Sequence, residues 1–226
     1  MTAAPPLPVA SAPILQLSRG GVVLLGSEEV RRGLRAQFDL HHVVRLPQLL
    51  DRPLLERVQR NLLQSRFSPF VHQGIGRDIR LEDNPTSGLL LLLANSPALC
   101  RIIEDITSCD YIGSFSGHLY RMMPGGDHYD SWHDDAVQER VVGMSINLSG
   151  AVYSGGIFHL RDRATGRILC QAVNTGFGDA ILFRLSPQLE HCVTPVDGAF
   201  PKTAFAGWFR SVPPDQAPLR GCYGGG

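Results

Sequence analysis

The sequence predicts a mainly β protein with flanking α-helices, and a double-stranded β-helix, or jelly roll, as its core. From Ser114 onward, short β-rich segments alternate with turn residues at intervals of about ten residues, which is typical of an all-β sandwich or barrel. Eight strands are expected there, as a jelly roll requires, near residues 116–123, 129–134, 140–148, 156–161, 168–174, 179–185, 190–196 and 202–210. The residues before Ser114 show apolar side chains at helical spacing instead, so helices are expected to cover one sheet from outside.

Four helices are predicted before the strand-rich part. Ser27, which precedes two acidic residues, is an N-cap that begins a helix to about Phe38. Asp51 begins a second helix, whose leucines recur at helical spacing. A leucine-rich run and a Ser-Pro start predict two more helices, over about 88–94 and 96–107. Short strands are expected at 22–25 and 43–46.

The segment from Ser65 to Pro85 is predicted to be a loop, since it contains glycines and charges without a clear period. It is long enough to act as a lid over a site, and it suits a surface crossover equally well. If it is a lid, Arg77 and Arg80 could meet an acidic group on a substrate.

These elements divide the chain into four parts. They are a disordered N-terminal segment (1–13), a helical and mixed support region (14–113), the jelly-roll core (114–210) and a C-terminal tail (211–226). No internal repeat and no linker separates two halves of the chain.

Composition narrows the function classes. Lys plus Arg balance Asp plus Glu at 21 each, so no basic excess predicts a nucleic-acid partner. The five cysteines are odd in number and form no C-x-x-C, which favours a reducing, cytoplasmic location. No signal peptide is recognised, and the leucine-rich run is too short to span a bilayer, so no membrane association is expected. The oligomeric state cannot be predicted.

The most informative motif is His133-Asp134-Asp135, together with a distant His191. Two imidazoles and one carboxylate are the ligands of the facial triad of non-haem Fe(II) oxygenases. His133 and Asp135 are two residues apart, so on a strand both side chains point to one face. We therefore expect His133, Asp135 and His191 to bind a metal ion and to leave half of its coordination sphere open.

A second H-x-D triplet, His128 and Asp130, is a rival for the same role. A triplet of this kind arises easily by chance, so the surrounding sequence has to decide. His128 lies close to the turn at 124–126, where the chain is expected still to bend, whereas His133 precedes a clear strand. The pair at 133 and 135 is therefore preferred.

Six short motifs follow one another through this half of the chain: Tyr120 with Pro124-Gly125-Gly126, His133 with Asp135, Gly155-Gly156, Gly178-Asp179-Ala180, the run from His191 to Val196, and Lys202. In this order they resemble the Fe(II)/2-oxoglutarate-dependent dioxygenase superfamily, especially its prolyl-4-hydroxylase-like branch. The resemblance covers about residues 114–210.

The resemblance implies Fe(II), 2-oxoglutarate and dioxygen as cofactor and cosubstrates, with ascorbate as a supporting reductant. Lys202 would hold the far carboxylate of 2-oxoglutarate, and Arg210 is the competing cation. The family often has a hydroxyl two residues after this cation, where Ala204 stands here. Tyr120 is expected to supply the missing hydrogen bond.

The implied activity is hydroxylation of a peptide side chain or a small metabolite, with release of succinate and carbon dioxide. No catalytic residue beyond the metal ligands is expected. Two alternatives remain: a cupin-like metalloprotein that does not use 2-oxoglutarate, and a jelly-roll binding module without catalysis.

Overall fold

A computed structural model describes residues 12–125, 127–137 and 139–212, so most of the predicted N-terminal segment (1–13) and C-terminal tail (211–226) lies outside the described residues. The elements follow in the order β1 (Leu15–Ser18), β2 (Gly21–Leu24), α1 (Glu28–His41), β3 (Val43–Leu46), α2 (Arg52–Leu63), β4 (Phe67–His72), β5 (Gly76–Leu81), α3 (Pro85–Ala94), α4 (Pro97–Thr107), β6 (Ser114–Met122), β7 (Tyr129–His133), β8 (Arg140–Asn147), β9 (Ser154–Gly155), β10 (Phe158–Asp162), β11 (Ile168–Ala172), β12 (Ala180–Arg184), β13 (Leu189–Val193), β14 (Val196–Asp197) and β15 (Lys202–Arg210).

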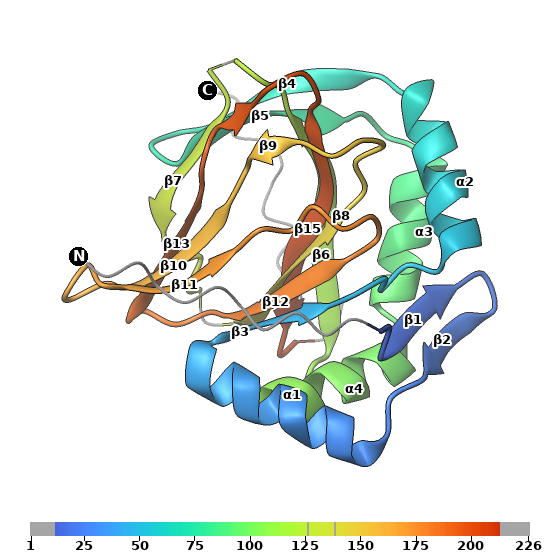
Figure 1. The fold of residues 1–226 in the computed structure, drawn as a ribbon, viewed down its shortest axis with the longest axis vertical. Coiled ribbons are helices and arrows are strands. Elements are labelled where there is room, and N and C mark those ends of the chain that lie inside the picture. Colours follow the sequence, from blue (N-terminus) through green and yellow to red (C-terminus); the bar gives the residue numbers. More distant parts are fainter. Residues whose placement is uncertain (1–11, 126, 138, 213–226) are drawn as a thin grey trace.

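One antiparallel sheet of eleven strands dominates the described part of the chain. Ten of its strands follow in the order β11-β10-β13-β7-β5-β6-β15-β8-β12-β3, and β4 pairs with β5 beside this path. The sheet rolls up so that β10 and β13 face β12 across the interior (Figure 1). The ring centroids of Phe158 on β10 and Phe183 on β12 are 4.8 Å apart, so the two halves meet inside the roll. The prediction of a mainly β jelly roll with flanking helices is confirmed.

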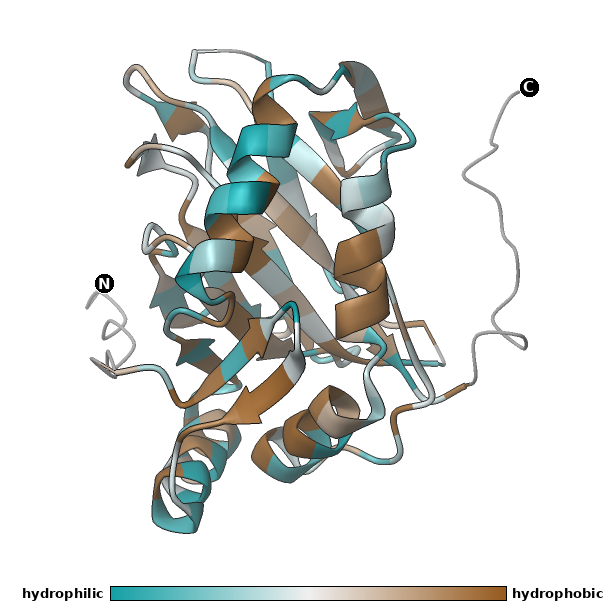
Figure 2. Ribbon diagram, turned by 90° about the vertical axis from the view of Figure 1, so that its right-hand side faces the viewer, coloured by the Kyte–Doolittle hydropathy of each residue, from teal (hydrophilic) through white to brown (hydrophobic). Residues whose placement is uncertain are grey.

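The four helices lie on the outer side of the roll. Figure 2 shows two of them crossing the sheet, with hydrophobic strand residues behind. The predicted N-caps are present, because the Ser27 side chain accepts a hydrogen bond from the Val30 N–H and the Asp51 carboxylate accepts one from Leu54. A large core beneath the helices joins them to the sheet, with fully buried side chains that include Leu54, Ile103, Phe205 and Phe209.

A second, smaller core fills part of the roll itself. It includes Phe158, Leu160, Phe183 and Val193, all buried. Fully burying a side chain of this size stabilises the fold by roughly 1.5–3 kcal/mol. This core makes the roll rigid around the open end, where polar side chains replace apolar ones.

The prediction of a loop over 65–85 is wrong for most of its length. Residues 67–81 form the β4–β5 hairpin, in which Phe67 pairs with Leu81 and His72 with Gly76. Strand β5 also pairs with both β6 and β7, so the hairpin is part of the rolled sheet. Pro69 fits because β4 pairs only with β5, and an edge strand tolerates a residue without an N–H donor.

Strand β1, which pairs with β2, was not predicted. Helix α1 extends three residues beyond the predicted end at Phe38. It stops because His42 adopts a left-handed conformation, with its N–H bonded to the Phe38 carbonyl.

Among the described residues, no helix taken singly is long and apolar enough to cross a membrane. The bent pair of α3 and α4, at 56° to each other, reaches the needed length and hydropathy only when counted together.

Candidate functional site

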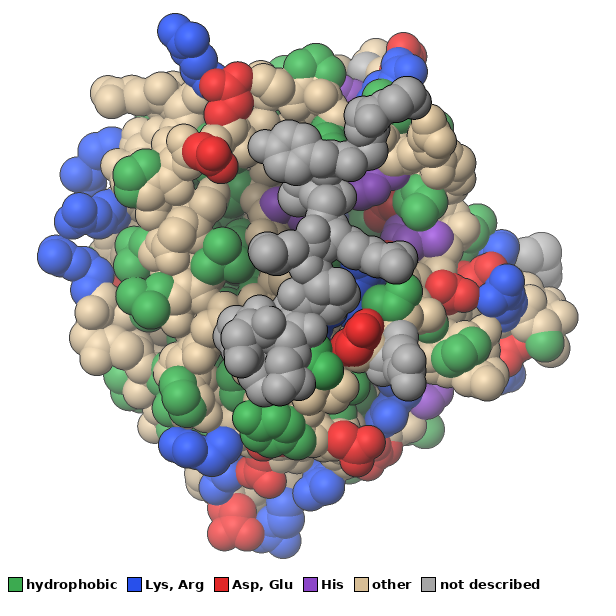
Figure 3. Space-filling view, turned by 180° about the vertical axis from the view of Figure 1, so that it is seen from behind, with side chains coloured by type: hydrophobic (Ala, Val, Ile, Leu, Met, Phe, Trp, Pro, Cys, Tyr) green, Lys and Arg blue, Asp and Glu red, His purple; other side chains and the backbone are tan. Residues whose placement is uncertain are grey.

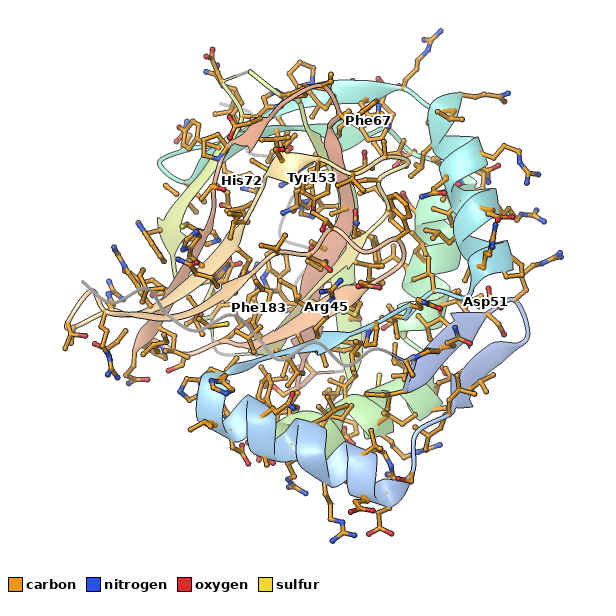
Figure 4. All side chains as sticks on the ribbon, viewed as in Figure 1. Arg45, Asp51, Phe67, His72, Tyr153 and Phe183 are labelled. Atoms are coloured by element: carbon orange, nitrogen blue, oxygen red, sulfur yellow. The ribbon has the colours of Figure 1, made fainter. Side chains whose placement is uncertain are left out.

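A cavity of about 320 Å³ opens at one end of the roll, between the β4–β5 hairpin and the strands of the interior. Its size is at the lower end of the range for small-molecule sites. Figure 4 labels two of its lining side chains, His72 from β4 and Phe183 from β12. Several histidine side chains show on the face turned to the viewer in Figure 3.

The structure brings His133, Asp135 and His191 together in this cavity. One potential ligand atom from each lies within 4.8 Å of the others. Asp135 Oδ2 is 3.4 Å from His133 Nε2 and 3.5 Å from His191 Nε2. The two histidines come from neighbouring strands, β7 and β13, where they are paired in register.

The reason why Asp135 reaches the two histidines differs from the prediction. Strand β7 ends at His133, and Asp135 has a left-handed backbone with φ of 51°, so the two side chains are not related by strand alternation. Left-handed backbone is uncommon outside glycine, although aspartate tolerates it better than most residues. The turn after β7 therefore directs the carboxylate toward the histidines.

Two donors hold the Asp135 carboxylate in place. Arg140 Nη1 donates to Oδ1 at 3.0 Å, and Trp208 Nε1 donates to Oδ2 at 2.8 Å. The Arg140 guanidinium also lies 3.6 Å from the centroid of the Trp208 ring, so the two donors support each other. Neither residue was predicted as part of the site.

The triad is electrostatically coupled. Burial pushes the pKa of His133 down, but the Asp135 and Asp130 carboxylates outweigh this effect and raise it to about 9. Burial opposes ionisation of Asp135, yet hydrogen bonds from the two imidazoles lower its pKa below the ordinary range. The structure thus holds an ionised carboxylate beside two imidazoles, a donor set suited to a divalent cation.

The surroundings of the imidazoles fix their orientation. His133 Nδ1 lies 2.7 Å from the Ser131 carbonyl oxygen, which leaves Nε2 facing Asp135. His191 is buried between Phe158 and Phe183, at ring-centroid distances of 5.7 and 4.8 Å. A metal-binding histidine commonly has its other nitrogen held in this way.

Lys202 lines the cavity and is 4% exposed. Its Nζ donates to the Gly156 carbonyl at 3.1 Å. Burial lowers the pKa of Lys202 to about 8, although Asp130 opposes the shift. Arg210, the competing cation, does not line the cavity and pairs with Glu139 at 3.8 Å.

Tyr120 lines the cavity on β6, opposite Ala204 of β15 in register. Burial raises the pKa of Tyr120, so its phenol remains protonated. Ser145 on β8 also lines the cavity and is hydrogen-bonded to Tyr120, a second hydroxyl that the sequence did not indicate. Asn174, on the same cavity wall, has a buried Oδ1 without a hydrogen-bond partner among the described residues.

The rival pair is not brought together as a ligand set. His128 Nδ1 accepts a hydrogen bond from the Met123 N–H in the preceding turn. Asp130 does line the cavity, 3.5 Å from His133 Nδ1. Within the described residues, the groups that could hold a metal ion therefore include His133 and Asp135 rather than His128.

A second group of potential ligands was missed. His72, Asp78 and His118, from β4, β5 and β6, also offer atoms within 4.8 Å of one another. Arg80 contacts His72 and lies 3.6 Å from Asp78, so a cation already occupies this group. Burial lowers the pKa of His72 to about 4 and that of His118 to about 3, which keeps both neutral. Hairpin pairing assembles this group, and no sequence spacing indicates it.

Comparison with known proteins finds a family match over part of the chain and several similar folds. Residues 117–210 match the sequence model of the 2OG-Fe(II) oxygenase superfamily. No curated protein matches the chain. A 2OG-Fe(II) oxygenase family oxidoreductase from Burkholderia pseudomallei is similar over 82% of this chain and 93% of that chain, with a TM-score of 0.63 and 19% identity.

Two further solved structures share the fold. A prolyl-4-hydroxylase from Pseudomonas putida has a TM-score of 0.59 at 19% identity, over 80% of this chain and 98% of that chain. The epimerase SnoN, solved with Fe³⁺, α-ketoglutarate and nogalamycin RO, has a TM-score of 0.57 at 13% identity, over 86% of this chain and 93% of that chain. The fold is therefore shared with 2OG-Fe(II) oxygenases, and the family match falls on the part of the chain that carries the predicted motif order.

Proposed function

We propose that this chain, whose residues 117–210 match the 2OG-Fe(II) oxygenase superfamily and whose fold is that of such enzymes, is an Fe(II)- and 2-oxoglutarate-dependent hydroxylase. Its metal ligands are His133, Asp135 and His191. Its substrate is a peptide side chain or a small metabolite.

One observation carries the proposal: the triad and a buried lysine share one cavity. The donor set fits Fe(II), because two imidazole nitrogens and a carboxylate oxygen lie within 4.8 Å of one another. A lysine with one backbone partner is costly to bury unless an anion completes its interactions. The far carboxylate of 2-oxoglutarate is such an anion.

The residues around the site have separable roles. Arg140 and Trp208 hold the Asp135 carboxylate with one oxygen toward the histidines. Lys202 and Tyr120 bind the far carboxylate of 2-oxoglutarate, and Ser145 orients the Tyr120 hydroxyl. When bound, the iron, 2-oxoglutarate and dioxygen together would supply the oxidising chemistry: one oxygen atom of dioxygen would enter succinate as carbon dioxide leaves, and the other would enter the substrate.

The apolar wall limits side reactions. Phe158, Ile181, Phe183 and Val193 line the cavity beside the triad. This apolar lining limits the entry of water, which strengthens the interaction between Lys202 and a carboxylate.

The structural relatives leave the substrate class open between peptides and small molecules. One is a prolyl-4-hydroxylase, and another is an epimerase solved with nogalamycin RO. The two alternative functions make different predictions: a cupin-like metalloprotein binds iron without 2-oxoglutarate, and a binding module binds neither.

The test is an anaerobic titration of the full chain with Fe(II) and 2-oxoglutarate. We expect the weak visible charge-transfer band of the iron–2-oxoglutarate chelate to appear in the native protein and to be lost in His133→Ala. His128→Ala is the matched control, since this histidine bonds a backbone N–H in the preceding turn, and it should keep the band.

Three outcomes would contradict the proposal. Iron binding without the band on adding 2-oxoglutarate would favour the cupin-like alternative. Absence of iron binding would favour a binding module. Loss of the band in His128→Ala, with retention in His133→Ala, would show that the other triplet supplies the ligands.

A further inference from the structure

We propose that the substrate carries a cationic group, an ammonium or a guanidinium, which is bound in the cavity by the carboxylate of Asp130. The inference rests on the proposed function, because it concerns the half of the cavity left for substrate once iron and 2-oxoglutarate are bound.

Several of the charged side chains that line the cavity have an ion-pair partner. Asp78 lies 3.6 Å from Arg80, and Arg77, at the rim, lies 3.2 Å from Asp127. Asp135 lies 3.0 Å from Arg140 and faces the metal position. Lys202 is assigned to the far carboxylate of 2-oxoglutarate.

In the part of the chain that the structure describes, Asp130 has no arginine or lysine partner at such a distance, although Lys202 attracts its carboxylate from further away. Within the described residues, the only basic group within 4.0 Å of its carboxylate is His133 Nδ1, at 3.5 Å. This contact is long for a hydrogen bond, so the Asp130 carboxylate has no hydrogen-bonded cation among the described residues. A cationic ligand in the cavity would supply one.

The simpler role of Asp130, as the group that orients His133, is already filled. The Ser131 carbonyl oxygen is 2.7 Å from His133 Nδ1, well within hydrogen-bonding distance, whereas the Asp130 contact of 3.5 Å is long. The Asp130 side chain also remains 30% exposed, and the residue lines the cavity. It therefore faces the space that a substrate would enter.

The local backbone places this carboxylate beside the triad. Strands β13 and β7 pair His191 with His133 and Val193 with Asp130, and the register shifts between these two pairs. Across from it, Gly76 of β5 approaches so closely that a Cβ would lie 2.5 Å from the Tyr129 carbonyl oxygen. Tyr129 lines the cavity next to Asp130 and is half exposed, so an aromatic ring is available for a bound cation.

The experiment uses the full chain loaded anaerobically with Fe(II) and 2-oxoglutarate, and follows the visible band of the chelate. The probes are matched pairs that differ in charge: N-acetyl-lysine amide against N-acetyl-norleucine amide, N-acetyl-arginine amide against N-acetyl-citrulline amide, and hexylamine against hexanol. We expect at least one cationic probe to perturb the band at a concentration at least about tenfold lower than its neutral partner, as a charge-assisted hydrogen bond implies.

Asp130→Asn tests the residue itself, because it keeps the shape of the side chain and removes the charge. We expect this variant to retain the band but to lose the preference for the cationic probe. Asp127→Asn is the matched control: Asp127 is exposed and does not line the cavity, so the preference should persist.

The inference would be overturned if the cationic and neutral probes of every pair perturbed the band at the same concentration, or if no probe perturbed it. In either case, the presence of the band would still support the proposed function. Loss of the band in Asp130→Asn would also overturn the inference, since Asp130 would then serve the metal. Absence of the band in the native protein would contradict the proposed function itself, and with it the inference.

Discussion

Lys202 is a residue whose burial makes sense only with a ligand. Its Nζ bonds one backbone carbonyl, and its pKa is lowered to about 8 by burial. We expect Lys202→Met to weaken 2-oxoglutarate binding by at least about tenfold, the scale of a hydrogen bond to a charged group. Isothermal titration of the Fe(II)-loaded protein, anaerobically, measures the change. Arg210→Met should bind 2-oxoglutarate like the native chain, and the reverse result would make Arg210 the binding cation.

The same lysine predicts a pH dependence. A carboxylate binds the protonated amine, so the affinity for 2-oxoglutarate should be constant below the pKa of about 8 and should fall as the pH rises above it. Titrations between pH 7 and pH 9.5 would show this decline, and Lys202→Met should lack it. An affinity that rises above pH 8 would exclude the lysine as the binding group.

Trp208 is a positioning residue for the metal ligand Asp135, through the 2.8 Å hydrogen bond to Oδ2. We expect Trp208→Phe to weaken Fe(II) binding by about tenfold, the lower end of the effect of losing such a support. Trp132→Phe is the control, because the other tryptophan lies against Arg161 and does not line the cavity. Direct metal titration, without turnover, measures both variants. An unchanged affinity in Trp208→Phe would mean that Arg140 alone holds the carboxylate.

At this scale, sequence identified the residues that belong to a motif and missed those that depend on register. His133 and Asp135 were predicted from their spacing, and Lys202 from the family resemblance; all three line the cavity. Ser145 and Trp208 were not, because each reaches the cavity only through pairing of β15 with β8, which no local pattern reveals. Asp135 was found for a partly wrong reason, since a left-handed turn, and not strand alternation, directs it.

At the scale of elements, the turn before β12 depends on a buried ion pair with β3. Asp179 accepts hydrogen bonds from Arg45 Nε and from the Gln48 N–H, both at 2.8 Å. Asp179→Ala would leave the arginine without this partner, and breaking a buried pair costs about 3–5 kcal/mol. Urea unfolding should show a lower midpoint. Glu56→Ala, which removes the exposed pair with Arg52, should leave the midpoint unchanged; equal effects would show that the buried pair has no special role.

The β4–β5 hairpin is an element that the sequence did not predict. Its strands contain Pro69, four charged or histidine side chains and no regular alternation, because one face meets the cavity and the other meets solvent. Polar residues that line a cavity look like loop residues in a sequence. The long strands β6, β8 and β15 were predicted well because their apolar residues pack into the two cores.

For the whole molecule, metal binding and folding stability should be linked through His133. Its pKa in the metal-free fold is raised to about 9, above the unfolded value near 6.5, so its stabilising contribution is fully present below pH 6.5 and is lost as the pH rises through 9. Lys202 acts in the opposite direction, but only above its lowered pKa of about 8. Between pH 6.5 and pH 8, the contribution of His133 to stability should therefore fall as the pH rises. His72 and His118, whose pKa values burial lowers, act in the opposite direction near pH 6.5, where the unfolded chain loses its histidine protons.

Bound Fe(II) should reverse this trend, because it requires the unprotonated imidazole and competes with the proton for the same nitrogen. Its stabilising effect should grow with pH over this interval, at a fixed metal concentration. Melting temperatures measured anaerobically with and without Fe(II), at steps from pH 6.5 to pH 8, test both statements. The His133 contribution is the difference between the native protein and His133→Ala: in the metal-free state this difference should shrink from pH 6.5 to pH 8, and Fe(II) should add little to the variant. A difference that stays level or grows across this interval would show that the Asp135 and Asp130 carboxylates do not hold a proton on His133, and the electrostatic account of the triad would fail with it.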